Sequence, residues 1–209
     1  MGYCDYWNNT STANIKYHNE EWGVPVHNDC RLFECLMLEV LQCGLNWQII
    51  INKRTIFRRC FDNFDFNKIA DYNEQDNERI MHTEGMVKSP HKIAAIIHNA
   101  QKFQNIRTEF GSFAAYLWAY TNNKTILYDK HSDGYIPVSN GLSVRISNDL
   151  KKRGFKYVGP TTIYSYLQAC GIINDHDKNC PRYHYINAHF PTIRQPRDIE
   201  QQIHCFVNE

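Results

Sequence analysis

The stretch Lys-Lys-Arg-Gly-Phe-Lys-Tyr-Val-Gly-Pro-Thr-Thr, residues 151–162, joins two segments of helical periodicity and decides the prediction of the fold. Gly154 and Gly159 bracket a short hairpin, and Pro160 stands where the first turn of a helix tolerates proline. This is the layout of a helix-hairpin-helix, which can present backbone N–H groups to a DNA phosphate while lysines follow the backbone. An ordinary helix–loop–helix corner with solvated lysines explains the same residues, so the stretch alone leaves both interpretations open.

Helical periodicity dominates on both sides of this stretch, and we predict an all-α fold. Apolar residues repeat with helix spacing over 32–41, 49–61, 93–103, 113–120, 142–150 and 163–170. Gly44 ends the first of these helices, Asn46 caps the second, and Ser89 with Pro90 begins the third. In the second helix, the positions expected to face inward are Ile49, Ile50, Phe57 and Phe61. Residues 121–139 are expected to form a long irregular connection.

The composition indicates a globular chain outside membranes. With 209 residues, 43% of them hydrophobic, the chain can form one large domain or two lobes that share a cleft. No apolar run approaches the roughly 20 residues that span a bilayer, and no signal-peptide layout is present, so we expect a cytosolic protein. A net charge of +1 gives no global attraction to DNA, which leaves two local basic patches, at 53–59 and 151–156.

Four potential metal ligands lie near the two ends of the chain: Cys4, His18, His176 and Cys180. Zinc favours thiolate and imidazole ligands in closed tetrahedral sites, and a spacing of four lets His176 and Cys180 face one ion. Such a site would be structural, because protein atoms fill all four positions. The eight cysteines and ten histidines of the chain also produce chance pairs, so unrelated core or surface residues remain the alternative.

Glu39 lies at the border of an otherwise apolar helix face, where a carboxylate must face a cleft or be costly to bury. Tyr17, Trp22 and Trp47 stand close to it in the sequence. Aromatic faces with one carboxylate suit a flat cationic ligand such as N3-alkylated adenine. The alternative is that the aromatic residues fill the core and that Glu39 is a carboxylate on the helix surface.

Several separated motifs occur in an order that resembles the DNA-3-methyladenine glycosylase I family, which belongs to the helix-hairpin-helix superfamily. The resemblance runs from about Cys4 to Cys180. The motifs that carry it are Tyr17-His18, Glu21 to Pro25, Leu38-Glu39, Gly44 to Trp47, Arg153 to Gly159, Gln168 to Gly171 and Asn174 to His176. The family often has Asp where this chain has Asn19, and Ser where it has Asn46.

The resemblance implies two helical lobes around a cleft and a zinc snap that joins the N- and C-terminal segments through one structural Zn2+. The ligands of that zinc fall on Cys4, His18, His176 and Cys180. In the base pocket, the resemblance implies Glu39 as the base-recognising carboxylate and catalytic candidate, Tyr17 as the hydrogen-bonding phenol, Trp47 as the stacking indole and Trp22 as a lining residue. Leu45 then fills the gap that the flipped base leaves, and further DNA contacts fall on Lys152, Lys156, Gly159 and Thr161.

The activity that the resemblance implies is removal of N3-methylated adenine from duplex DNA by hydrolysis of its glycosidic bond, leaving an abasic site. No lysine in the matched pocket can form a Schiff base, so strand cleavage is not expected. We also expect the protein to be a monomer. Asp175 lies where other members of the superfamily use an aspartate, but we expect it to support or cap neighbouring groups. Two alternatives remain: a zinc-stabilised DNA-binding protein without catalysis, and a glycosylase for a broader set of alkylpurines.

The resemblance covers a glycosylase domain at 1–183 and leaves 184–209 as an extension of unknown role. Prolines at 181, 191 and 196 predict an extended segment there. Residues 199–207 carry apolar positions that fit one short amphipathic helix.

Overall fold

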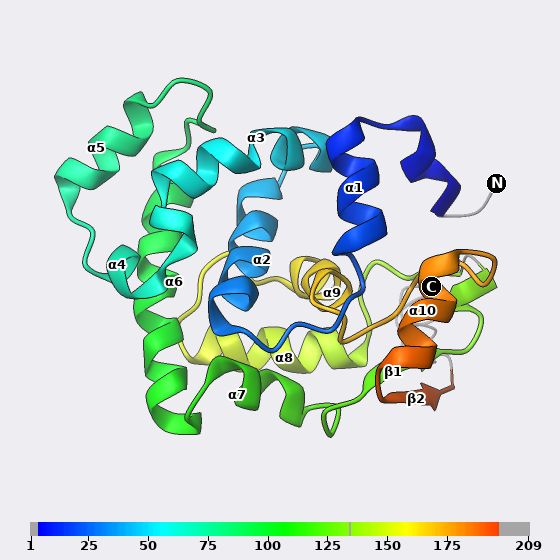
Figure 1. Ribbon diagram of the computed structural model, residues 1–209. Coiled ribbons are helices and arrows are strands. Elements are labelled where there is room, and N and C mark those ends of the chain that lie inside the picture. The colour runs from blue at the N-terminus through cyan, green and yellow to red at the C-terminus, as the bar shows by residue number, and fades with distance from the viewer. Residues whose placement is uncertain (1–3, 134, 197–209) are drawn as a thin grey trace, which may run out of the picture. The chain divides into compact units, whose positions relative to one another are not determined.

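The computed structural model describes residues 4–133 and 135–196 (Figure 1). The chain folds into two compact units. The terminal unit contains the described residues up to Pro25, residues 118–148 and the described residues from Gly159 onward. The central unit contains residues 26–117 and 149–158. Among the described residues, no helix combines the length and the apolarity that crossing a bilayer requires.

The central unit is helical. It contains α2 (Asp29–Gln42), α3 (Trp47–Cys60), η2 (Asp62–Phe64), α4 (Phe66–Ala70), α5 (Glu74–His82), α6 (Pro90–Phe110) and most of α7 (Phe113–Ala119). Every residue of α2 from Leu32 to Leu41 is buried, so this helix forms the centre of the unit. The Phe103 ring of α6 stacks on Phe113 at 4.0 Å between centroids.

Helix boundaries in the central unit follow the sequence signals. α2 ends two residues before Gly44, and the Asn46 side chain accepts the Gln48 N–H at 2.8 Å, which caps α3. Pro90 opens α6, although the Ser89 side chain makes no capping hydrogen bond. The prediction that Ile49 faces inward is wrong, because its side chain is 40% exposed. Ile49 lies about 100° around the helix from the buried Ile50, which shares its face with Phe57 and Phe61.

The terminal unit combines helices with a small parallel sheet. It contains η1 (Cys4–Asn9), α1 (Thr12–Glu20), β1 (Thr125–Tyr128), η3 (His131–Asp133), most of α8 (Gly141–Lys152), α9 (Pro160–Ala169), α10 (Pro181–His189) and β2 (Thr192–Gln195). β1 pairs with β2 in parallel from Thr125 opposite Thr192 to Tyr128 opposite Gln195. Ile126 of β1 also bridges to Ile173, which follows α9.

Two expectations for this unit are wrong. Residues 121–139 were expected to be irregular, but they contain β1, whose four residues are all buried. The partner strand β2 lies far along the chain, so no local hairpin signal announces the pair. The segment from residue 181 was expected to be extended, but α10 forms because Pro181 occupies the first helical turn, where no N–H is needed. The helix expected at 199–207 lies outside the described residues, and the boundary at 183 falls within α10.

Candidate functional site

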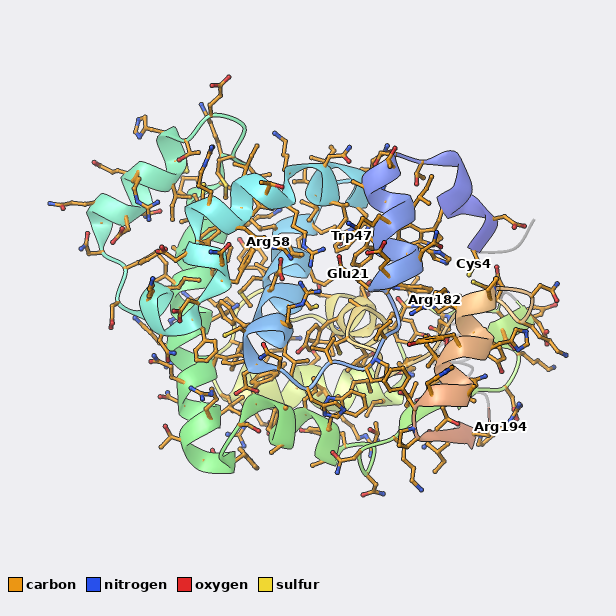
Figure 2. The ribbon with its side chains drawn as sticks, viewed as in Figure 1. Cys4, Glu21, Trp47, Arg58, Arg182 and Arg194 are labelled. Atoms are coloured by element: carbon orange, nitrogen blue, oxygen red, sulfur yellow. The ribbon has the colours of Figure 1, made fainter. Side chains whose placement is uncertain are left out.

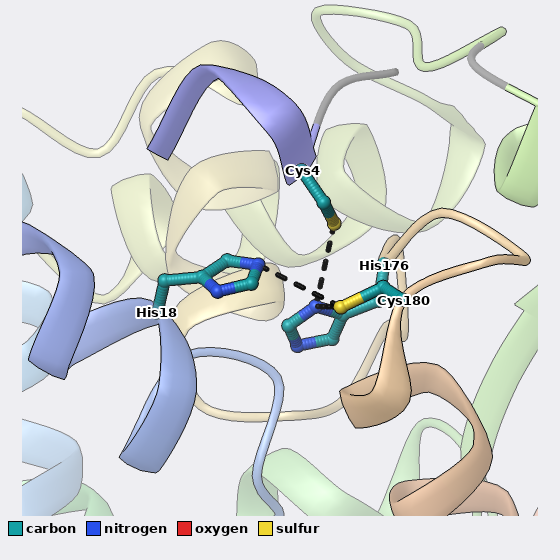
Figure 3. Close-up of side chains that lie close together, drawn as sticks. All are labelled: Cys4, His18, His176 and Cys180. Carbon is teal, nitrogen blue, oxygen red and sulfur yellow. Dashed lines mark hydrogen bonds between the residues drawn. The ribbon is translucent and has the colours of Figure 1, made fainter. Parts of the chain in front are cut away.

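The terminal unit brings together the four predicted metal ligands, Cys4, His18, His176 and Cys180 (Figure 3). All four side chains are buried, and their ligand atoms lie within 4.8 Å of one another. His176 Nδ1 is 3.6 Å from Cys4 Sγ and 3.5 Å from Cys180 Sγ. Two ligands on a tetrahedral zinc stand about 3.6 Å apart, given metal bonds of roughly 2.1 Å to nitrogen and 2.3 Å to sulfur. The donor set and its spacing therefore fit a closed site for such an ion.

Hydrogen bonds to the two histidines select the ring nitrogens that face the centre of this cluster. His18 Nδ1 donates to Asn19 Oδ1 at 2.9 Å, which leaves Nε2 directed at Cys180 Sγ, 4.0 Å away. His176 Nε2 donates to the Trp22 carbonyl oxygen at 2.9 Å, which leaves Nδ1 for the thiols. Neutral imidazoles fixed in this way are the form that binds a metal.

The Trp22–Gly23 turn is shaped around His176. Gly23 has a φ of +77°, and a Cβ at this position would lie 3.0 Å from the His176 ring. Glycine is therefore required both for the left-handed backbone and for the close approach. The Trp22 ring meets His176 edge to face at 4.5 Å between centroids and stacks near His18 at 5.9 Å. Trp22 thus packs on the histidines of the cluster.

The two thiols of the cluster differ in acidity because they lie against each other. The hydrogen bond with Cys180, followed by burial, raises the pKa of the Cys4 thiol well above its usual range. The hydrogen bond from Cys4 lowers the pKa of Cys180 far below its usual range, and contacts with His176 and His18 act in the same direction. The Asp177 N–H also donates to Cys4 Sγ at 3.2 Å. The cluster therefore favours at least one thiolate, the form that binds metals.

Glu39 lies inside the central unit, not at the border of a helix face. Its side chain is 4% exposed, and α2 is buried on all sides at this level. Burial raises the pKa of Glu39 to about 8. No side chain within residues 4–133 and 135–196 forms an ion pair or hydrogen bond with its carboxyl group. A buried acid without a partner is costly as an anion, and such groups mark candidate functional sites.

The turn that follows α2 carries two of the predicted site residues, Leu45 and Trp47. The Leu45 N–H donates to the Gln42 carbonyl oxygen at 2.6 Å, and the Gln42 side chain donates to the Leu45 carbonyl oxygen at 3.2 Å. Trp47 is the first residue of α3 and is half-buried (Figure 2). The sequence did not indicate Lys92 of α6, whose Nζ donates to the carbonyl oxygens of Leu41 and Cys43 at 2.7 and 2.6 Å.

The predicted base pocket draws on both units. Tyr17 and Trp22 belong to the terminal unit, whereas Glu39 and Trp47 belong to the central unit. Tyr17 is 5% exposed and lies one residue before His18 on α1, so this helix carries both the phenol and one ligand of the metal cluster. Neither unit contains all four residues, and their joint pocket stays a prediction.

The predicted hairpin occupies residues 153–159 between α8 and α9. Phe155 and Val158 are buried, whereas Lys156 and Tyr157 are exposed. Lys152 and Thr161 are also exposed, and Gly159 stands at the N-cap of α9. The buried Phe155 and Val158 thus anchor the hairpin, and the two residues between them are exposed at its tip.

The two predicted basic patches differ in how many of their cations form ion pairs within the protein. In the patch at 53–59, Arg54 and Arg58 both donate to the buried Glu34, at 2.8 and 2.7 Å (Figure 2 labels Arg58). These two guanidinium groups belong to an internal ion network and Lys53 donates to the Gly85 carbonyl oxygen at 2.6 Å, whereas Arg59 is exposed. A DNA contact of this patch stays a prediction. In the patch at 151–156, Arg153 pairs with Glu109 and Asp149, while Lys151, Lys152 and Lys156 are exposed.

Asp175 is part of a buried network. One carboxylate oxygen lies 2.7 Å from His131 Nδ1, and the other accepts from Tyr164 at 2.6 Å and from Gln168 at 2.8 Å. Its side chain is fully buried. These bonds agree with the expectation that Asp175 supports neighbouring groups.

Comparisons with known proteins give one consistent result. The family model for methyladenine glycosylase matches residues 7–183. DNA-3-methyladenine glycosylase 1 of Escherichia coli (strain K12) is 38% identical over 177 residues, which cover 85% of this chain and 95% of that protein. The chain belongs to the methyladenine glycosylase family.

Solved structures of the family agree with the fold described here. A crystal structure of 3-methyladenine DNA glycosylase I has a TM-score of 0.78 at 39% identity, covering 82% of this chain and 94% of that one. A structure of the Staphylococcus aureus enzyme, reported for its recognition of 3-methyladenine, has a TM-score of 0.77 at 34% identity, covering 82% of this chain and 91% of that one. The mostly helical fold predicted from the sequence is confirmed.

The family match ends before the C-terminal elements. The matched residues stop at 183, so most of α10 and all of β2 lie beyond them. These elements are nevertheless built into the terminal unit, because β2 pairs with the buried β1 and the Asn174 side chain donates to Asn187 at 3.1 Å.

Proposed function

We propose that this protein is a 3-methyladenine DNA glycosylase, which flips N3-methylated adenine out of duplex DNA and hydrolyses the bond between the base and its sugar. The observation that carries this proposal is Glu39, a buried carboxyl group without a cationic partner and with a pKa raised to about 8. An adenine alkylated at N3 in DNA carries a fixed positive charge. Such a base supplies the missing partner, because an adjacent cation lowers the pKa of the carboxyl group and stabilises its anion.

The aromatic residues complete this recognition in the proposal. The Trp47 indole stacks on the flipped base, Tyr17 supplies a hydrogen bond and Trp22 lines the pocket. A cation on a desolvated indole gains roughly 2 kcal/mol, more than a tenfold preference over a neutral base. Normal adenine lacks both this gain and the pairing with Glu39, so the pocket discriminates by charge.

The chemistry needs little acid catalysis. When the bond between the base and the sugar breaks, its electron pair stays on the ring nitrogen, so the cationic base leaves as a neutral molecule. Water then adds to the cationic sugar carbon and loses a proton, which leaves an abasic site. We infer that Glu39 recognises the charged base and keeps it beside the sugar, that Leu45 occupies the gap in the duplex, and that no strand is cut.

The proposed contacts to the DNA backbone come from the hairpin region: Lys152, Lys156, Gly159 and Thr161. Lysines attract phosphates without reading the base sequence. The Cys4, His18, His176 and Cys180 cluster would hold one Zn2+, which stabilises the fold and, with all four positions filled by protein, offers none to an activated water. The charge of that ion would also favour both thiols as thiolates.

Incubation with methylated duplex DNA, followed by chromatography of the released bases, tests the activity. We expect 3-methyladenine well above the rate without protein, and reduced release by Glu39→Gln and Trp47→Ala. Glu84→Gln is the matched control, since Glu84 is an exposed carboxylate. Absence of 3-methyladenine with the wild-type protein would refute the enzyme and favour the rival function of a zinc-stabilised DNA-binding protein. Chromatography of 3-methylguanine in the same samples distinguishes a broader alkylpurine glycosylase.

A further inference from the structure

The long helix α6 carries two buried polar residues on one face. Lys92 is 9% exposed and Asn99 is fully buried. Asn99 follows Lys92 by seven positions, so their side chains leave the helix in nearly the same direction, about 10.5 Å apart along its axis. Polar groups in such positions need partners, and both residues bond to backbone atoms of other segments of the central unit.

Lys92 binds the end of α2. Its ammonium group donates to the carbonyl oxygens of Leu41 and Cys43, which the end of a helix leaves without intrahelical partners. A cation at this end also interacts favourably with the negative pole of the helix dipole. The next residues form the turn that carries Leu45, so Lys92 fixes the start of that turn.

Asn99 binds the backbone of the hairpin at Lys156. Its Oδ1 accepts the Lys156 N–H at 2.8 Å, and its Nδ2 donates to the Lys156 carbonyl oxygen at 3.0 Å. The preceding residue, His98, lies with Nε2 2.8 Å from the Gly154 carbonyl oxygen. One turn of α6 therefore holds the hairpin backbone at two points and leaves the Lys156 side chain exposed.

The backbone of Tyr157, which follows Lys156, shows that the bonds from Asn99 impose a conformation on the hairpin. Tyr157 has a φ of +60° and a side chain that is 41% exposed. A tyrosine is strained in this left-handed region, and such conformations persist only where the surroundings enforce them. Asn99 on one side and the buried Val158 on the other supply that enforcement.

We propose that α6 sets the spacing of two DNA-contacting loops, with Lys92 as the positioning residue for the Leu45 turn and Asn99 as the positioning residue for the Lys156–Tyr157 tip. This inference rests on the proposed function, which assigns DNA contacts to Leu45 and Lys156. The consequence is preorganisation: the loops hold their spacing before DNA arrives, so binding does not bear the entropy of ordering them.

Substitutions of Asn99 and of Lys92 should change DNA binding in different ways. Asn99→Ala loosens a phosphate contact, which acts alike on intact and damaged DNA, so we expect about tenfold weaker binding to both duplexes. Lys92→Met loosens the turn that carries Leu45, the residue proposed to fill the gap that the flipped base leaves in the duplex. We therefore expect this variant to lose the preference for a duplex with an abasic-site analogue over an intact duplex. Gln104→Ala is the matched control, because the Gln104 side chain of α6 donates to Asn67 Oδ1 of α4 at 3.2 Å and to neither loop.

A double-variant cycle tests whether Asn99 acts through Lys156. Alone, Lys156→Ala should reduce the dependence of DNA affinity on salt by about one phosphate contact. In the Asn99→Ala background it should add little further reduction, because the unpositioned lysine no longer contributes its contact. Full additivity of the two changes would overturn the assignment of Asn99.

Binding of free 3-methyladenine separates this inference from a folding defect and from failure of the proposed function. Both α6 variants should bind the free base within twofold of the wild-type affinity, which a misfolded protein would not. Wild-type affinity for both duplexes in Asn99→Ala, or an intact abasic preference in Lys92→Met, would overturn the inference and leave the proposed function in place. A wild-type protein that binds no DNA would refute the proposed function itself. Should Asn99→Ala not fold, Asn99→Asp keeps the bond from the Lys156 N–H and should give an intermediate loss.

Discussion

His176 Nε2 donates to the carbonyl oxygen of Trp22 at 2.9 Å, and this bond decides which nitrogen of His176 faces the two thiols. A carbonyl oxygen only accepts, so Nε2 must carry the proton and Nδ1 must be the ligand atom. His18 is held in the opposite tautomer, since its Nδ1 donates to Asn19 Oδ1. The two imidazoles are thus prepared for a metal by partners outside the cluster.

Substitution of Asn19 should change how firmly the metal is held. An amide oxygen is a weaker acceptor than a carboxylate, so Asn19→Asp should make His18 more basic and slow metal release, whereas Asn19→Ala should weaken affinity by tenfold or more. Transfer of zinc to a chromogenic chelator measures both. The expected order of release rates is Asn19→Ala fastest and Asn19→Asp slowest. Equal rates in all three proteins would show that Asn19 does not support the ligand.

Glu39→Gln should make the protein more stable in alkaline solution. Burial raises the pKa of Glu39 from 4.5 to about 8, so the folded state favours the protonated acid. Its stability contribution is complete below pH 4.5 and is lost as the pH rises through 8, by up to about 5 kcal/mol at roughly 1.4 kcal/mol per unit. Glutamine resembles the neutral acid and does not titrate. Urea unfolding from pH 5 to pH 8.5 should therefore show a growing advantage of Glu39→Gln over wild type, absent in Glu84→Gln. A constant difference across this range would contradict the raised pKa.

The same carboxyl group should make binding of a cationic base depend on pH. A permanently charged adenine, alkylated at two ring nitrogens, needs the ionised form of Glu39, which is scarce below pH 8. Its affinity should rise up to tenfold per pH unit toward pH 8 and then level off. Calorimetric titration at several pH values measures this, with neutral adenine as the control ligand. The slope should vanish in Glu39→Gln, and a slope that survives would assign the titration to another group.

Features encoded locally could be predicted from the sequence, whereas those that depend on distant backbone atoms could not. Asn46 caps α3 through a bond to a neighbouring residue, and the ring of Pro160 favours the first turn of α9. The starts of both helices could therefore be predicted from the sequence. Lys92 and Asn99 gave no signal, because their partners are carbonyl and N–H groups of residues about 50 positions away. Their one sequence trait is a polar residue on the buried stripe of a helix.

The site shows the same limit. Residue type and spacing made the four metal ligands candidates, the resemblance to the family selected them among eight cysteines and ten histidines, and the structure brings them together. In the basic patch at 53–59, the sequence did not show that Arg54 and Arg58 bind Glu34, because that buried residue lies on a different helix. Charge runs report composition, but whether a cation remains available depends on tertiary partners.

Removal of β2 should destabilise the terminal unit, although the matched family region ends before this strand. The Thr125 N–H donates to the Pro191 carbonyl oxygen at 2.9 Å, and the Asp129 N–H donates to Gln195 at 3.0 Å. A chain that ends at residue 190 loses these bonds and exposes the edge of β1, whose residues are buried. At about 1 kcal/mol per hydrogen bond plus exposed apolar surface, we expect a loss of about 2–4 kcal/mol. An uncovered strand edge also promotes aggregation.

A chain that ends at Pro196 is the matched control for this truncation, because it keeps β2 and removes only residues 197–209. Thermal unfolding and light scattering of the two truncated proteins should separate them: the shorter one unfolds at a lower temperature and aggregates, while the longer one behaves as the full chain. The metal-binding cluster lies outside the removed segment, so both should bind one zinc. Equal unfolding temperatures for the two truncations would show that β2 contributes no stability, and its pairing with β1 would then be incidental to the fold.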